Sequence, residues 1–285
     1  MPDSQAVPPQ SMRIASQAGQ LESKLRDWLK SQGYPLELRT ARAFQEAGHV
    51  KQSNYYYDTE SDCYREIDVH VSLQSLPDDD ADWIELALCI EVKSANDKPW
   101  VLFSGREKPP LLPISAAYQR IASPAAKEWM RSWAFRRKIR DMPLLELEDY
   151  SGHSLIRANL APNQREDVAY KAILSAVKAA RWEAQRAGET DEESILLAFP
   201  VVVIDAPLFK CTLDDNSDDL RLWRVDWGTL VWRNAVTRGE GTHTIVHVVT
   251  ESALKEYADK AVQTIGTLSE VRKKYPIRKG EQTEG

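Results

Sequence analysis

The sequence predicts a mixed α/β fold in which a central sheet is flanked by helices. Residues 65–71 and 88–94 are short, apolar, β-branched runs of the kind found in buried strands. Residues 166–186 carry an apolar stripe with helical period, and residues 195–204 form a nearly continuous apolar strand after it. Strands alternating with a helix of this length indicate layers packed around one core.

The first fifty residues predict a tail and two helices. Residues 1–19 are polar with scattered prolines, so we expect them to be disordered. A helix over residues 20–32 is stopped by Gly33, and a second helix over residues 36–47 ends at Gly48. The second helix has apolar side chains at helical spacing, which we expect to face the core. These are Leu38, Ala41, Phe44 and Ala47.

The next part of the chain predicts three strands in succession and then a long insertion. A tyrosine-rich strand over residues 50–57 precedes the runs at 65–71 and 88–94. Residues 96–162 contain several prolines and a helical pattern over residues 125–140. Because a structureless loop of this length is rare in a compact domain, we predict a helical insertion between the third strand and the next core helix.

The C-terminal third predicts a β extension and a closing helix. Three segments alternate like antiparallel strands, with a glycine-rich turn at residues 239–241 between the last two. These strands are expected at residues 222–227, 229–236 and 244–249. A helix over residues 252–265 follows. We expect one domain over residues 20–270 and a basic, flexible tail over residues 271–285.

Charged side chains within the two short strands carry the functional signal. Asp68 and Glu91 each interrupt an apolar run, where an unpaired carboxylate is costly. Lys93 lies two residues beyond Glu91, so both point to the same face of a strand. Two such carboxylates can hold a hard divalent cation, beside an ammonium that helps to activate water against a phosphodiester. The alternatives are a strand-end Asp68 satisfied by backbone donors and a structural Glu91–Lys93 pair.

These residues resemble the PD-(D/E)XK nuclease superfamily, which has the restriction-endonuclease-like fold. Asp68 matches the first acid, and the tripeptide from Glu91 to Lys93 matches the E-x-K element. The order helix, three strands, helix, strand over about residues 20–205 matches the core of that fold. The sequence departs from the family motif at Ile67, where the motif has proline. The resemblance implies phosphodiester hydrolysis that depends on Mg²⁺ or Mn²⁺.

The resemblance also implies roles for individual residues. The two strand acids would bind the metal with the backbone carbonyl of Val92 nearby, and Lys93 would orient or deprotonate the attacking water. In the superfamily a glutamate on the preceding helix often completes the metal shell, which points to Glu37, with Glu46 as the alternative on the same helix. A glutamate in the first turn of a helix is also favoured by the helix dipole alone.

Two basic segments and one helical lysine are the predicted nucleic-acid contacts. Residues 131–140 and 272–279 interleave basic and aromatic side chains, as a surface that follows a phosphate backbone would. A solvated helix face and a charged tail are the equal alternatives. Lys171 would contact a phosphate by analogy with related nucleases, and the alternative is a solvated helix residue. From the first segment we expect contacts from Arg136, Arg137 and Lys138.

The composition limits the function classes. The 285 residues, 42% of them hydrophobic, suffice for a full core. A net charge of −6 is unusual for a nucleic-acid binder, so any basic face must be local. Three separated cysteines form no zinc or disulfide pattern, and neither a secretory signal nor a transmembrane segment is evident. We therefore expect a cytoplasmic protein without membrane contact.

The predicted function is metal-dependent hydrolysis of phosphodiester bonds in DNA. A role in defence against foreign DNA or in repair is an association with the fold rather than an inference from residues. The alternative is a non-catalytic module of nuclease fold that serves as a binding or scaffolding platform. The expected partners are DNA and either a second copy of the chain or a protein of a larger system.

Overall fold

One mixed sheet runs through the computed structural model, which describes residues 10–75, 83–94, 98–105, 120–131, 133–147, 151–159, 168–214, 217–233 and 243–274. Its strands are β1 (His49–Asp58), β2 (Cys63–Gln74), β3 (Ile84–Lys93), β4 (Trp100–Ser104), β5 (Ile121–Ala122), β6 (Gly152–Arg157), β7 (Ile195–Ile204), β8 (Leu208–Leu213), β9 (Leu220–Val225), β10 (Trp227–Arg233) and β11 (His243–Thr250). Within these residues the strand order is β1-β2-β3-β7-β11-β10-β6-β4-β8-β9, with β5 paired to β7.

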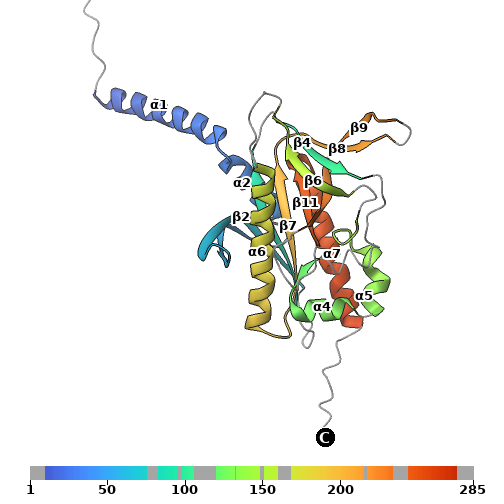
Figure 1. Ribbon diagram of the computed structural model, residues 1–285. Coiled ribbons are helices and arrows are strands. Elements are labelled where there is room, and N and C mark those ends of the chain that lie inside the picture. Colours follow the sequence, from blue (N-terminus) through green and yellow to red (C-terminus); the bar gives the residue numbers. More distant parts are fainter. Residues whose placement is uncertain are drawn as a thin grey trace, which may run out of the picture.

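Helices cover both faces of this sheet (Figure 1). The described helices are α1 (Gln10–Ser31), which extends away from the sheet, α2 (Tyr34–Phe44), α4 (Pro124–Met130), α5 (Trp133–Lys138), α6 (Val168–Thr190) and α7 (Leu254–Lys274). Two 3₁₀ turns, η1 (Ile139–Asp141) and η2 (Glu251–Ala253), follow α5 and precede α7. None of the described helices is long and apolar enough to cross a membrane.

The centre of the sheet joins an antiparallel meander to a parallel strand. β1, β2 and β3 pair antiparallel in sequence order, and β7 lies parallel to β3 from the Ile84–Ile195 pair to the Lys93–Ile204 pair. Every residue of β7 is buried, as predicted for a strand covered on both faces. The C-terminal ends of β3 and β7 therefore lie side by side at one edge of the sheet.

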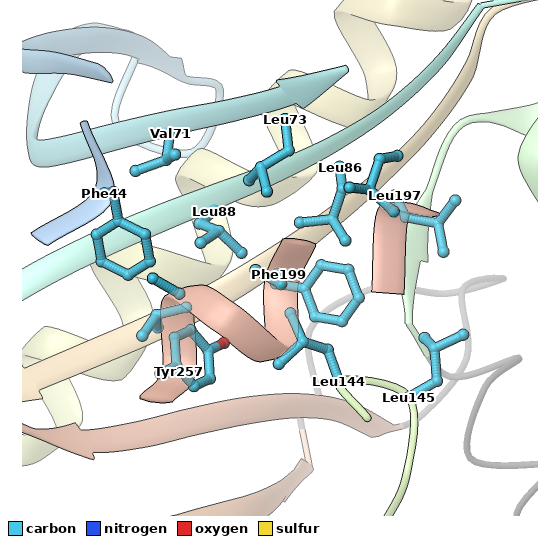
Figure 2. Packing of buried hydrophobic residues seen from close by; sticks show 14 of the residues in the cluster. Phe44, Val71, Leu73, Leu86, Leu88, Leu144, Leu145, Leu197, Phe199 and Tyr257 are labelled. Carbon is cyan, nitrogen blue, oxygen red and sulfur yellow. The ribbon is translucent and has the colours of Figure 1, made fainter. Parts of the chain in front are cut away.

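Two hydrophobic clusters sandwich the central strands. On one face, α2 and α7 pack against β2, β3 and β7, and Figure 2 shows Phe44 and Tyr257 from these helices beside Leu88 and Phe199. On the other face α6 packs its predicted apolar stripe. The buried side chains of that stripe include Ala169, Ala172, Ile173, Ala176, Val177 and Ala180. The mixed α/β architecture expected from the sequence is confirmed.

The N-terminal region differs from the prediction. Helix α1 begins at Gln10, so residues 10–19 are helical instead of disordered. In α2 the buried stripe is Leu36, Thr40, Ala41 and Phe44. Leu38, which was predicted to face the core, is 59% exposed. At the other end α7 continues to Lys274, so the first residues of the predicted tail belong to a helix. The remaining residues of both predicted tails, 1–9 and 275–285, lie outside the described part.

The predicted helical insertion also contributes strands to the main sheet. β4 and β6 pair with each other, β4 lies parallel to β8, and β5 pairs with β7. The prediction missed these strands because they are short. An amphipathic run of only two to six residues gives too weak a periodicity to indicate a strand. The helical pattern at 125–140 is split into α4 and α5.

The C-terminal extension is part of the same sheet. β10 and β11 pair antiparallel as predicted, while residues 239–241 of the expected turn lie outside the described residues. β9 does not continue this pair, because it pairs with β8 at the far edge. β11 lies parallel to β7 and brings the extension into the centre of the sheet.

Burial of His70 under α6 predicts a loss of stability at acid pH. Burial lowers the pKa of His70 from its ordinary 6.5, although the Glu183 carboxylate at 3.5 Å from Nε2 acts in the opposite direction. The unfolded chain then binds the proton more readily, so stability present above pH 6.5 is lost as the pH falls through the folded pKa. We expect His70→Asn to reduce the pH dependence of the unfolding free energy just below pH 6.5, measured by urea titration. His153→Asn, at an exposed site, is the control, and identical slopes in all three proteins would refute the prediction.

Candidate active site

The two strand acids lie opposite each other across β2 and β3. The backbone ladder between these strands ends at the Val69–Ile90 pair, and the next step of the same register places Asp68 opposite Glu91. Residues directly opposite in an antiparallel pair share a face of the sheet. Asp68 is half-buried and Glu91 is buried, so neither carboxylate is fully hydrated.

The strands separate at this point, and Asp68 takes over a backbone hydrogen bond. The N–H of Val92 donates to Asp68 Oδ2 at 2.7 Å, where a continued ladder would offer a carbonyl of β2. The N–H and C=O of one strand residue point to the same neighbouring strand. The carbonyl of Val92 therefore also lies on the side of Asp68, as the predicted oxygen ligand requires.

Lys93 forms an ion pair within the same group. Its Nζ donates to Glu91 Oε1 at 2.6 Å, and the lysine side chain remains 29% exposed. Burial acts to lower the pKa of Lys93, but the adjacent Glu91 carboxylate outweighs it and raises that pKa. Lys93 is therefore a cation at neutral pH. Its ammonium group contacts the buried Glu91 carboxylate and remains accessible to solvent.

Glu37 joins the group from the first turn of α2. Burial and the negative charge of Asp68 raise the pKa of Glu37 to about 7. Its Oε1 lies against Gly33, where a Cβ would come within 3.4 Å, so the side chain bends back over the start of the helix. Glu46 lies beyond the other end of α2, in a groove beside α7. The structure thus brings Glu37, and not Glu46, to the strand acids.

Mutual repulsion characterises these carboxylates, which we call the acid cluster: Asp68, Glu91 and Glu37. Burial raises the pKa of Asp68, and burial together with the charge of Asp68 raises the pKa of Glu91. Acids held together in this way are stabilised by a nearby cation. Lys93 supplies one positive charge to the cluster.

The donor set fits a hard divalent cation at its two strand positions. Asp68 and Glu91 offer carboxylate oxygens from one face, and the Val92 carbonyl adds a third oxygen, which suits Mg²⁺. Among the described residues, no group of three or more His, Cys, Asp and Glu side chains is close enough to hold a metal ion. The described residues therefore do not form a metal shell of three carboxylates that includes Glu37, whose link to the strand acids is electrostatic.

Sequence reasoning missed two residues behind Glu91. The hydroxyl of Ser175 on α6 lies close enough to the Glu91 carboxylate and to the Tyr56 hydroxyl to hydrogen-bond with them. Tyr56 is only 2% exposed, so this row of polar groups leads from the acid cluster into the protein. A lone serine within the alanine-rich stripe of α6 was the available signal, but its partner could not be read from the sequence.

The predicted nucleic-acid contacts are divided between two ends of the molecule. Lys171 is exposed on α6, one helical turn before Ser175, and therefore lies on the side of the helix that faces the acid cluster. Helix α5 carries the other predicted contacts, Arg136, Arg137 and Lys138, of which the Arg136 side chain lies outside the described part. Arg137 is exposed, and Lys138 pairs with Asp141 at 2.8 Å.

Helix α5 lies at the end of the sheet away from Lys93. Its neighbour α4 is capped at its N-terminus by Ser123, whose hydroxyl donates to the carbonyl of Ser194, just before β7 starts. The turn after α5 contacts the C-terminal half of α7 through the bond from Thr267 to the carbonyl of Asp141. Figure 1 shows α4 and α5 together at this end. Helix α5 and the turn after it therefore lie at the opposite end of the sheet from Lys93.

Comparison with known proteins assigns the chain to no family. The chain matches no family model, and neither the curated proteins nor the solved structures contain a match to it.

Proposed function

We propose that the protein is a metal-dependent nuclease of the PD-(D/E)XK type that hydrolyses phosphodiester bonds in DNA. The observation that carries this proposal is the placement of Asp68 opposite Glu91, with Lys93 ion-paired beside them at the point where β2 and β3 separate. The order α2, β1, β2, β3, α6, β7, with β7 parallel to β3, supports the restriction-endonuclease-like core.

Each residue of the group has a distinct task in this reaction. Asp68, Glu91 and the Val92 carbonyl would hold Mg²⁺ or Mn²⁺, which when bound supplies Lewis acidity and neutralises charge on the scissile phosphate. Lys93, held by Glu91, positions the attacking water and stabilises the negative charge that develops on the phosphate. Glu37, whose pKa burial and the charge of Asp68 raise to about 7, would exchange a proton with this water.

The proposal is tested by incubating the purified protein with labelled DNA and RNA oligonucleotides. Single strands and duplexes are each compared in Mg²⁺, in Mn²⁺ and in excess chelator. We expect cleavage of DNA only with the divalent ion. Binding without cleavage under every condition would favour the non-catalytic scaffold, and absence of both would refute the nuclease proposal.

Lys171 is expected to contribute a phosphate contact. In Ca²⁺, which permits binding without cleavage in many metal-dependent nucleases, Lys171→Ala should weaken DNA binding and lower the slope of log affinity against log salt by about one unit. The double change Arg137→Ala and Lys138→Ala is the matched control, because α5 lies at the other end of the sheet. The reverse pattern in a fluorescence anisotropy titration would move the binding surface to α5.

A further inference from the structure

Ser175 connects Glu91 to the interior of the protein. Its hydroxyl lies within hydrogen-bonding reach of the Glu91 carboxylate on one side and of the Tyr56 hydroxyl on the other. Glu91 is 8% exposed and Tyr56 is 2% exposed, so water has little access to this row. A buried carboxylate requires partners for its oxygens, and the partners of Glu91 include Lys93 and Ser175.

Helix α6, which carries Ser175, is anchored to the strands next to the site. Three residues further along, Lys178 Nζ donates to both oxygens of Asp58 at 2.9 Å, and it also pairs with Glu60 at 2.7 Å. Asp58 ends β1, two residues after Tyr56. The alanine-rich stripe around Ser175 brings α6 close to the sheet. The hydroxyl of Ser175 is therefore held in a fixed position relative to Glu91.

We propose that Ser175 is a positioning residue that orients the Glu91 carboxylate for metal binding, with Tyr56 behind it. The proposal rests on the nuclease function proposed above. A carboxylate whose one oxygen accepts from Lys93 can still rotate about its last bond, and a second donor on a rigid helix removes that freedom. Loss of such an outer partner typically lowers metal affinity about 10–100-fold.

The test measures Mn²⁺ affinity by titration calorimetry in the absence of nucleic acid. We expect Ser175→Ala to weaken binding by about 10-fold or more. Ser175→Thr keeps the hydroxyl and should restore most of the affinity, and Tyr56→Phe should cause a smaller loss. The control is Thr190→Ala, which removes a hydroxyl from the C-terminal end of the same helix, where it donates to the carbonyl of Arg186.

The unfolding midpoint of each metal-free protein separates positioning from folding. The proposal requires weaker Mn²⁺ binding in Ser175→Ala, with a midpoint close to that of the unchanged protein and with recovery in Ser175→Thr. Unchanged affinity in Ser175→Ala would overturn this inference alone. The inference would also be overturned if Ser175→Ala lost Mn²⁺ affinity together with a lowered unfolding midpoint and Ser175→Thr did not recover that affinity. Absence of Mn²⁺ binding by the unchanged protein would overturn the proposed nuclease function and this inference together.

Discussion

Replacement of Lys93 by alanine is expected to lower the cleavage rate by about 10²–10⁴-fold, the range over which a positioned acid–base group contributes. The Lys93 ammonium is the cation beside Asp68 and Glu91, and it has solvent access from which it can contact a water and a phosphate. Mn²⁺ binding should persist, because the oxygen ligands remain. The measurement is the single-turnover cleavage rate at saturating metal.

A second variant guards against a loss caused by misfolding. Lys93→Ala leaves the buried Glu91 carboxylate without its ion-pair partner, which destabilises a protein. Lys93→Gln retains a donor for Glu91 but lacks the charge, and it should be as inactive. Lys255→Ala, at an exposed site on α7, should keep full activity. Normal cleavage by either Lys93 variant would refute the assigned role.

The second large effect concerns metal binding by Asp68. Asp68→Asn keeps an oxygen that can accept from the Val92 N–H but removes the negative charge that attracts a cation. Unchanged protein should gain about 2.7 kcal/mol of unfolding free energy at a Mn²⁺ concentration about one hundred times its dissociation constant. The variant should gain nothing at that concentration and should not cleave DNA.

Without added metal, Asp68→Asn is expected to have an unfolding free energy equal to or greater than that of the unchanged protein. The charge of Asp68 raises the pKa of both Glu37 and Glu91, so its removal relieves repulsion within the acid cluster. Asp191→Asn, in the turn before β7, is the control, since asparagine can accept the same bond from the Glu193 N–H. Equal stabilisation of Asp68→Asn and unchanged protein by Mn²⁺ would rule out Asp68 as a ligand.

Local patterns in the sequence were enough to predict the centre of the molecule. The apolar runs of β3 and β7 and the stripe of α6 repeat over enough residues to define their type. The side-chain period of two along β3 is sufficient to place Glu91 and Lys93 on one face of the strand. The strand acids and the lysine therefore followed from spacing and chemistry within short segments.

Contacts between distant segments were decided only by the tertiary structure. The Val92 N–H bonds to Asp68, 24 residues earlier, and Ser175 on helix α6 lies beside Glu91 on strand β3. The side-chain period indicates which residues share a face of a strand or helix, but not which other elements pack against that face. For the same reason the sequence could not place the basic segment at 131–140 relative to the acid cluster, because α4 and α5 are positioned by long-range contacts with β7 and α7.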